Sequence, residues 1–422
     1  MLDIHFIRNN AQIIKDAARK KNIEVDIDEL LMVDDQRREI LQKVESLRAE
    51  QNEAGKNIAT ADSHEVREQL LAEMRALKID LQQGEASLKE IMKTWRSLMM
   101  RVPNIPDISV PEGKGEEDNV QVGTWGTLPE FDFPIRDHIE IMTALDMVDF
   151  DRGTKVHGFR GYFLKNAGAD LSWALWNYAR DFFGKRDFQH VIAPTMIRKP
   201  YFYATGHLPA EADDLYVTQD EDYMAGTSEV SVMAYYADEI IEADILPQRF
   251  LSFSPCFRRE AGSHSKDTKG LIRVHEFYKL EQVVLCEARH DISAQIHEEI
   301  TRNFEEFLES LELPYQRLLI CTGDLSASKV KQYDIEAWFP SQEQYRELAS
   351  ASYFHDFQTR RFNVRYTDEN GKKRFAHSLN NTAIATPRVL VALVENFQQA
   401  DGSIRIPAVL RPYMGGREYI TQ

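Results

Sequence analysis

Two segments with heptad spacing constrain this chain more than any other feature. Apolar residues recur in alternating steps of three and four over residues 30–58, and again over residues 70–98. This spacing predicts two long helices that pack along one apolar seam. Because the break between them, residues 59–68, is short, the two helices must run antiparallel. We therefore expect a long helical hairpin over residues 29–100.

The hairpin also carries polar signals. Its break contains Asp62 and, three residues later, Glu65, a capping-box pattern that predicts a helix start at Asp62. Periodicity alone leaves three interpretations open: a dimerisation coiled coil, a solvated spacer, or an arm that reads nucleic acid. The basic residues that would form a stripe for nucleic acid are Arg37, Arg38, Lys43, Arg67, Arg75 and Lys78.

Composition narrows the class of protein. The chain has 422 residues, enough for two or three domains, and its net charge of −17 argues against a general polyanion-binding surface. No stretch approaches the ~20 apolar residues of a membrane span, and the first residues lack a signal-peptide pattern. Cys256, Cys286 and Cys321 lie far apart, so neither a disulfide framework nor a zinc site is expected. We expect a cytoplasmic protein without a membrane partner.

The pattern changes beyond the hairpin. Residues 102–119 are rich in Pro and Gly and predict a linker. From 120 to 422, strand-like runs mix with amphipathic helices, which predicts an α+β domain with an antiparallel sheet flanked by helices. The predicted elements are strands at 249–260 and 271–285, helices at 290–311 and 386–399, and a hairpin over 357–381 that turns at 369–371.

The predicted strand at 271–285 has an unusual face. With a period of two, the residues that share this face are Arg273, His275, Phe277, Lys279 and Glu281. Neither face of the strand is cleanly apolar, so a simple core role is excluded. This mixture indicates a surface that holds a ligand with phosphates, a flat ring and an amine.

Several stretches resemble the motifs of class II aminoacyl-tRNA synthetases, in their seryl-tRNA synthetase form. FRREAGSHSKDTKGLIRVHEFYKLEQ (257–282) resembles motif 2, TPRVLVALVENFQ (386–398) resembles motif 3, and GKRDFQHVIAPTM (184–196) is similar to motif 1. The resemblance covers essentially the whole chain in order. Other matching stretches are MLDIHFIRNN at the start, GTSEV (226–230), YRELASASYFHDFQTRR (345–361), LNNTAIATPR (379–388) and IPAVLRPYMGG near the end.

The resemblance implies a domain organisation. Residues 1–101 would form a tRNA-binding domain with the arm at 29–100, residues 102–119 a linker, and residues 120–422 a class II catalytic domain. The chain departs from the family pattern at two positions. Tyr353 stands where the family usually has Asn, and Asp187 stands where it usually has Gly.

The family's reaction, by the same resemblance, has two steps. The carboxylate of L-serine attacks the α-phosphate of ATP to give seryl-adenylate and pyrophosphate, and the 3′-terminal ribose of tRNA(Ser) then accepts serine. A selenocysteine tRNA, which also receives serine where it exists, is left open as a second acceptor. The protein needs to align the reactants and neutralise charge. The implied cofactor is Mg2+, and the implied assembly is a homodimer.

The resemblance also assigns roles to residues for ATP. Arg258 would bind the α-phosphate, and Glu260, on the same expected strand face, would orient Arg258 or contact adenine. Arg388 would bind the γ-phosphate, so these three residues are the catalytic candidates. Phe277 would stack on adenine. The full set of ATP-binding candidates is Arg258, Glu260, Arg273, Val274, Phe277, Glu347, Ser350 and Arg388.

Magnesium, serine and the acceptor have their own candidates. Glu347 and Ser350 match the residues that ligate magnesium, and oxygen ligands suit this hard ion. The serine-binding candidates are Thr227 and Glu229 for the ammonium, Glu281, Asn380 and Thr382 for the pocket, and Arg258. The tRNA acceptor end would meet the loop that holds His264, Ser265, Lys266 and Lys269.

Two alternatives remain at the level of the sequence. One is a relative that loads serine or another small amino acid onto a carrier protein, although such relatives usually lack the long arm. The other is a catalytically silent paralogue that binds RNA, which the joint presence of Arg258, Glu281, Glu347 and Arg388 argues against.

Overall fold

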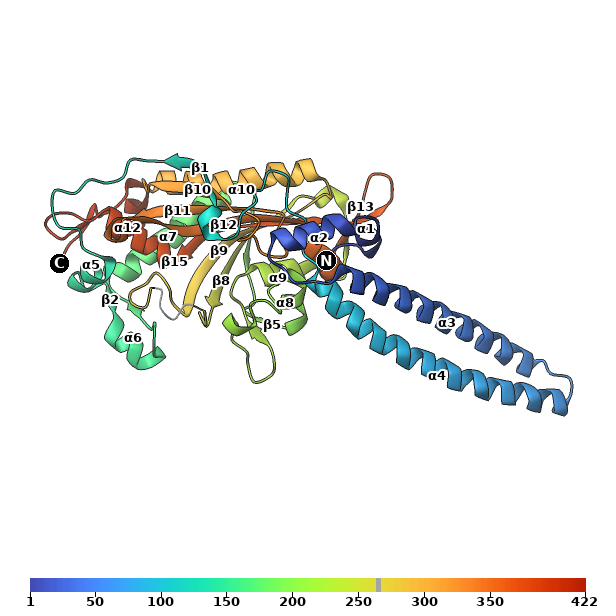
Figure 1. The fold of residues 1–422 in the computed structure, drawn as a ribbon. Coiled ribbons are helices and arrows are strands. Elements are labelled where there is room, and N and C mark those ends of the chain that lie inside the picture. Colours follow the sequence, from blue (N-terminus) through green and yellow to red (C-terminus); the bar gives the residue numbers. More distant parts are fainter. Residues whose placement is uncertain (263–266) are drawn as a thin grey trace. The chain divides into compact units, whose positions relative to one another are not determined.

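The computed structural model describes residues 1–262 and 267–422. Its chain, drawn in Figure 1, divides into two compact units, Met1–Pro103 and Asn104–Gln422. Each unit has buried apolar residues of its own. Within the described residues, no helix combines the length and the apolar character that crossing a membrane requires.

The first unit is helical, and its two long helices form the predicted hairpin. α3 and α4 run side by side as an antiparallel pair (Figure 1). Val44, Leu47 and Leu81 form a buried cluster in the seam between them. A Cβ at Gly84 would lie 3.0 Å from Cγ2 of Val44, so this glycine lets the two helices approach closely. The helices are α1 (Ile4–Asn9), α2 (Ala11–Lys20), α3 (Ile27–Ala59) and α4 (His64–Arg101).

The start of α4 differs from the prediction by one residue. Asp62 was expected to cap this helix, but the N-cap is Ser63, whose Oγ accepts a hydrogen bond from the backbone N–H of Val66 at 3.3 Å. Serine caps a helix about as well as aspartate. Two good caps in adjacent positions therefore cannot be ranked from the sequence.

An eight-stranded sheet forms the centre of the second unit. Its order is β1-β10-β11-β12-β15-β9-β8-β4, and all neighbours are antiparallel except β4 and β8. The predicted α+β fold is thereby confirmed. The strands are β1 (Val120–Trp125), β4 (Gln189–Ile192), β8 (Gln248–Phe257), β9 (Glu276–Cys286), β10 (Tyr315–Leu319), β11 (Lys331–Phe339), β12 (Gln344–His355) and β15 (His377–Thr386).

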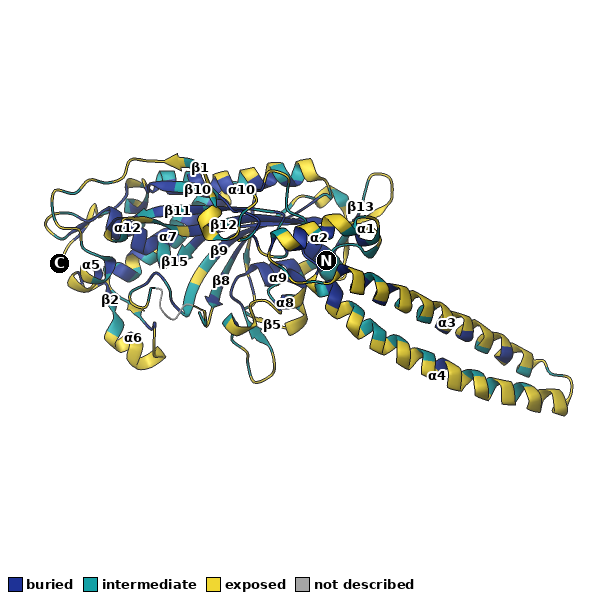
Figure 2. Ribbon diagram, in the orientation of Figure 1, coloured by how far each residue is buried: buried dark blue, intermediate teal, exposed yellow. Residues whose placement is uncertain are grey.

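Helices flank this sheet and complete its core. Phe183 of α7, Phe304 of α10 and Leu390 of α12 are fully buried in one apolar cluster with residues of the central strands. Figure 2 shows these strands mostly buried, whereas α10 also presents an exposed side, as expected for amphipathic helices. The helices are α5 (His138–Ala144), α6 (Phe150–His157), α7 (Ala167–Gly184), α8 (Lys199–Thr205), α9 (Glu229–Met233), α10 (His290–Ser310), α11 (Phe357–Phe362) and α12 (Arg388–Asn396).

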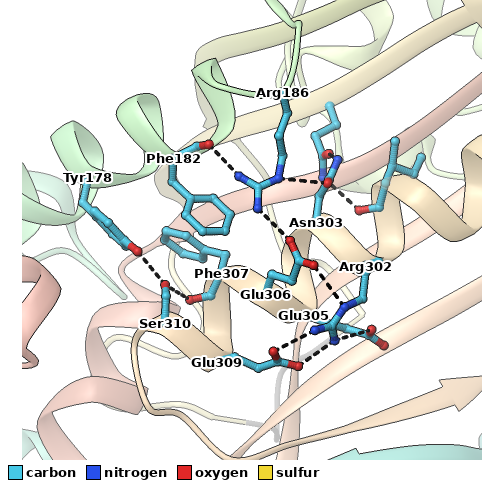
Figure 3. A network of polar contacts seen from close by, with 12 residues as sticks. Tyr178, Phe182, Arg186, Arg302, Asn303, Glu305, Glu306, Phe307, Glu309 and Ser310 are labelled. Atoms are coloured by element: carbon cyan, nitrogen blue, oxygen red, sulfur yellow. Dashed lines mark hydrogen bonds and ion pairs between the residues drawn. The ribbon is translucent and has the colours of Figure 1, made fainter.

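A polar network fastens the end of α7 to α10 (Figure 3). The guanidinium of Arg186 donates to the carbonyl of Phe182 at 2.7 Å, to Oδ1 of Asn303 at 3.0 Å and to Oε2 of Glu306 at 2.7 Å. It also lies 3.8 Å from the centre of the Phe182 ring. Because the planar guanidinium has donors on several sides, one side chain fixes two helices at once.

The two strands expected around the ligand-binding face are both shorter than the sequence suggested. β8 ends at Phe257 rather than at residue 260, and β9 begins at Glu276 rather than at residue 271. Glu260, with φ 54°, and Gly270, with φ 80°, adopt left-handed conformations that do not continue a strand. The segment that carries Arg273 therefore lies outside the sheet.

The predicted hairpin over 357–381 is right only in part. Its turn is confirmed, because β13 (Arg365–Thr367) pairs with β14 (Lys373–Phe375) across it. Its first residues form the short helix α11 instead of a strand. An ion pair between Arg360 and Asp356 at 2.8 Å, four residues apart, supports this helical turn.

The Pro- and Gly-rich segment 102–119 divides at Pro103 between the two units. Asn104 is buried in the second unit, where its Nδ2 donates to the carbonyls of Ser328 at 3.0 Å and Phe354 at 2.7 Å. Asn104 is therefore a packed residue of this unit, although it lies in the segment expected to be a linker.

Candidate functional site

Arg258 and Phe277 meet where β8 ends and β9 begins. The guanidinium carbon of Arg258 lies 5.4 Å from the centre of the Phe277 ring. Its Nε and Nη2 donate to the carbonyl of Gly226 at 3.4 and 3.3 Å. An aromatic face beside a guanidinium offers one surface for a flat ring and one donor for an anion.

Three further arginines form a group with Arg258, since the charges of Arg258 and of two of them act on the third, Arg388. Arg388 opens α12, and its Nε donates to the carbonyl of Ile272 at 3.2 Å while its Nη1 donates to the carbonyl of Glu347 at 2.6 Å. Burial and the neighbouring arginines lower the pKa of Arg388, and the charge of Glu347 opposes this shift. Such a concentration of positive charge is suited to a polyanion. We define the arginine group as Arg258, Arg273, Arg346 and Arg388.

Glu260 has a different neighbour from the one expected. Since β8 ends at Phe257, Glu260 and Arg258 do not share a strand face. The carboxylate of Glu260 instead forms an ion pair with Arg273. This pair joins the two flanks of the loop between β8 and β9.

A second cluster, the carboxylate pocket, lies beside the arginine group; its members are Thr227, Glu229, Glu281 and Asn380. Gly226, which accepts from Arg258, directly precedes Thr227 in the chain. Glu281 is 1% exposed and contacts Nζ of Lys279 at 2.9 Å, the hydroxyl of Thr227, and Nδ2 of Asn380 at 3.2 Å. Its charge is therefore matched by a cation and by donors.

Among the described residues, Glu229 receives hydrogen bonds from side-chain amides but has no cation at hydrogen-bond distance, unlike Glu281 with Lys279. Asn380 donates to its Oε2 and Gln358 donates to its Oε1, each at 2.6 Å. Thr382 stands directly across from Glu281 in the pairing of β15 with β9. The amide of Asn380 thus joins the carboxylates of Glu229 and Glu281, and the amide of Gln358 fixes Glu229 from a second side.

The two carboxylates differ in their electrostatics. Burial opposes ionisation of both, but Lys279 and the hydroxyl of Thr227 keep the pKa of Glu281 below its ordinary value. Burial, reinforced by the charge of Glu281, raises the pKa of Glu229. A positively charged ligand beside Glu229 would reverse that shift.

The magnesium candidates lie on β12. The side chain of Glu347 is 48% exposed and its Oε2 lies 4.0 Å from Nη1 of Arg388. Ser350 stands across from Asp334 of β11, and burial together with the charge of Glu347 raises the pKa of Asp334 to about 8. This set of oxygen atoms suits magnesium, which takes few protein ligands and keeps phosphate and water oxygens. Within 1–262 and 267–422, no three His, Cys, Asp or Glu residues gather as a metal site by themselves.

The remaining candidates fall near these clusters or outside the described residues. Val274 is buried, 5% exposed, in the segment that leads into β9. Lys269 precedes that segment. His264, Ser265 and Lys266 lie outside the described residues.

Sequence reasoning missed three residues of the site. Lys279 was placed on the correct face but received no role, although its period-two spacing from Glu281 was visible. Gln358 lies within the family-like stretch 345–361 and contacts Glu229 over 129 positions of sequence. Arg346 forms an ion pair with Asp267 and completes the arginine group. For Arg346, the adjacent candidate Glu347 was the available signal.

Comparisons with known proteins agree over the whole length. Residues 1–106 match the seryl-tRNA synthetase N-terminal domain, and residues 215–397 match the tRNA synthetase class II core domain (G, H, P, S and T). A serine–tRNA ligase of Deinococcus radiodurans is 45% identical over 100% of this chain and 99% of its own. A serine–tRNA ligase of Desulfitobacterium hafniense is 41% identical over 100% of both.

Solved structures give the same result. The seryl-tRNA synthetase of Pyrococcus horikoshii in complex with ATP has a TM-score of 0.90 and 36% identity, covering 100% of this chain and 99% of its own. The cytoplasmic serine–tRNA ligase of Naegleria fowleri in complex with AMP has a TM-score of 0.87 and 30% identity, with the same coverage.

Proposed function

The chain belongs to the seryl-tRNA synthetase family, and we propose that its serine–tRNA ligase reaction runs through the arginine group and the carboxylate pocket. One observation carries this proposal: a group of four cations and a buried carboxylate pair are joined through Gly226 and Thr227. Nucleotide phosphates would fit the first and a small amino acid the second. Their reacting atoms would meet between them.

The first step is attack of the carboxylate of serine on the α-phosphorus of ATP, with pyrophosphate as leaving group. Serine supplies the nucleophile, so the chain supplies position and charge. Arg258 is proposed to bind the α-phosphate and the carboxylate of serine. Arg388 is proposed to bind the γ-phosphate, because it is the first residue of α12 and the N-terminus of a helix favours anions. Phe277 offers its ring to adenine. Glu260, Arg273 and Val274 frame the same site.

Serine would be selected in the carboxylate pocket. The ammonium is proposed to sit beside Glu229, the carboxylate of the pocket whose pKa is raised, with Thr227 next to it. Glu281, Asn380 and Thr382 would line the side-chain end. A pocket with buried partners for a hydroxyl rejects alanine because those partners would be left unpaired.

Magnesium is proposed to be held by Glu347 and Ser350. When bound, it would neutralise phosphate charge as the pyrophosphate leaves. Burial and the charge of Glu347 raise the pKa of the nearby Asp334 carboxyl to about 8, and a bound cation would lower it.

The first unit is proposed to bind tRNA(Ser) through its arm. Lys43, Arg67, Arg75 and Lys78 are exposed on α3 and α4, where they could meet phosphates. Arg37 instead pairs with Asp34 and lies over Trp95, so Arg37 has an internal role. Recognition by shape and charge is typical of double-stranded RNA.

A homodimer is proposed from exposed apolar residues in and near the motif 1 region. Trp173 of α7 is 68% exposed, Ile192 of the edge strand β4 is 82% exposed, and Met196 is 67% exposed. Apolar side chains beside an open sheet edge favour association. The cytoplasm is proposed as the location, in keeping with the similarity to the cytoplasmic serine–tRNA ligase of Naegleria fowleri.

Transfer of serine to its acceptor tests this function. Radiolabelled serine, ATP and magnesium are incubated with the protein and either unfractionated tRNA or acyl carrier protein. Label in tRNA that is released by mild alkali supports the proposal. Label in the carrier protein alone would establish the carrier ligase, and no label in either would favour the silent paralogue.

A further inference from the structure

The segment that leads into β9 carries ATP-site candidates but lies outside the sheet. Arg273 and His275 precede Glu276, the first residue of β9. One backbone hydrogen bond, from the N–H of Arg258 to the carbonyl of His275 at 2.9 Å, connects this segment to the end of β8. Other contacts must therefore fix its position.

A buried histidine supplies such a contact from α5. The backbone N–H of Leu271 donates to Nε2 of His138 at 3.1 Å. Leu271 is fully buried and His138 is 4% exposed. The imidazole accepts at Nε2, so its Nδ1 carries the proton.

The carboxylate of Glu395 fixes this tautomer. Its Oε1 lies 2.9 Å from Nδ1 of His138 and accepts from the backbone N–H of the same residue at 3.1 Å. Its Oε2 accepts from the backbone N–H of Ser341 at 3.2 Å, and Glu395 is fully buried. The ring therefore has one orientation, with Nε2 aimed at Leu271.

Glu395 belongs to α12, and this helix also contacts the segment directly. Arg388, the first residue of α12, donates from Nε to the carbonyl of Ile272 at 3.2 Å. Arg388 and Glu395 are seven residues apart, which is two helical turns, so they share one side of α12. One helix thus fixes two consecutive residues, Leu271 through His138 and Ile272 directly.

Gly270 makes this close contact possible. It has φ 80°, and a Cβ at this position would collide with Nε2 of His138. A glycine is therefore required both for the backbone conformation and for the approach of the ring.

We propose that His138, oriented by Glu395, is a positioning residue that holds the entry to β9 in the geometry that binds ATP. The proposal rests on the proposed function, because it takes Arg273 and Phe277 as part of the ATP site. His138 does not touch the reactants in this account. Its effect reaches them through the backbone of Leu271.

Two substitutions separate the two contacts of the ring. Asn has its amide two bonds beyond Cβ, as Nδ1 is in histidine, so His138→Asn keeps a donor for Glu395 and loses the acceptor for Leu271. The amide of Gln is three bonds beyond Cβ, as Nε2 of histidine is, so His138→Gln keeps an acceptor for Leu271.

We expect His138→Asn to raise the KM for ATP about tenfold in serine-dependent ATP–pyrophosphate exchange. His138→Gln should stay within about threefold of the parent, and the KM for serine should change less than about twofold in both.

Hydrogen exchange of the unaltered protein gives a second readout. The amide of Leu271 should exchange as slowly as amides inside β9. His138→Asn should accelerate hydrogen exchange in peptides that contain Leu271 but not in peptides of β9. Fast exchange of this amide in the parent, or an equal KM for ATP in the parent and His138→Asn, overturns the inference. Absence of exchange activity in the parent contradicts the proposed function instead, and the amide measurement still decides the role of His138.

Discussion

The side-chain amide of Gln358 donates a 2.6 Å hydrogen bond to the carboxylate of Glu229, and both residues are buried. Ser378 donates to Oε1 of Gln358 at 2.8 Å, which fixes the amide so that its nitrogen faces Glu229. Gln358 therefore orients the carboxylate that is proposed to receive the ammonium of serine.

Replacing this donor should weaken serine binding selectively. Gln358→Met keeps the size of the side chain and removes the hydrogen bond. We expect the KM for serine to rise about tenfold, with the KM for ATP changed less than about twofold. Exchange kinetics measure both constants, and Gln344→Met, at an exposed residue of β12, is the control. An unchanged KM for serine would remove Gln358 from the site.

The arginine group should dominate the chemical step. Arg258→Ala and Arg388→Ala should each lower adenylate formation by orders of magnitude, because each removes a cation that is proposed to bind a phosphate of ATP. Arg152→Ala is a matched control, since that side chain is 77% exposed and pairs with Asp149 at the surface. Circular dichroism checks the fold. A variant of either arginine with near-parental activity would remove that residue from catalysis.

The arm should matter for tRNA and not for adenylate. Deleting the tip around residues 62–65 and rejoining α3 to α4 by a short Gly-Ser turn should reduce tRNA charging while serine-dependent exchange stays within about twofold. The physical reason is that the two units have separate cores. Equal losses in both assays would mean that the arm supports the catalytic unit.

Buried histidines should make the fold sensitive to acid. Burial lowers the pKa of His297 to about 4 and that of His377 to about 3, from 6.5 in an exposed chain. Protons then bind the unfolded chain first, so the free energy of unfolding falls as the pH drops from about 7 to 4, by up to ~1.4 kcal/mol per pH unit for each histidine.

Urea denaturation at several pH values measures this slope. His297→Asn, which removes one titrating ring next to the carbonyl of Ala351, should make the slope shallower between pH 6.5 and 4. A variant slope equal to that of the parent would mean that His297 does not titrate in the unfolding equilibrium.

Asp187 should lower the free energy of unfolding slightly, compared with glycine at the same position. It stands where the family usually has Gly, and its φ of 63° is left-handed. Asp187→Gly should raise the free energy of unfolding by up to ~1 kcal/mol, because Gly pays no steric penalty there. Thermal unfolding measures the difference. A lower midpoint would show that the Asp187 side chain makes a stabilising contact.

Local patterns were readable from the sequence. The heptad spacing correctly predicted the hairpin of α3 and α4, whose seam holds the buried cluster of Val44, Leu47 and Leu81. The period-two pattern correctly grouped Lys279 with Glu281, since both lie on β9 and their charged atoms are 2.9 Å apart. Such patterns depend on neighbours within a few residues.

Long-range contacts were not readable. Leu271 bonds to His138 across 133 positions, and Gln358 bonds to Glu229 across 129 positions. Glu260, three residues beyond the end of β8, adopts a left-handed conformation, which glutamate seldom adopts. No periodic pattern encodes these features, because they arise only when distant elements pack.

ATP–pyrophosphate exchange with purified protein and magnesium tests the central claim most directly. Serine, threonine, alanine and glycine are offered separately at equal concentration. The account predicts exchange with serine far above the other three, because it places the hydroxyl of serine among the buried polar groups of the carboxylate pocket. Folded protein that shows no exchange with any of them, or equal exchange with alanine, would contradict the account.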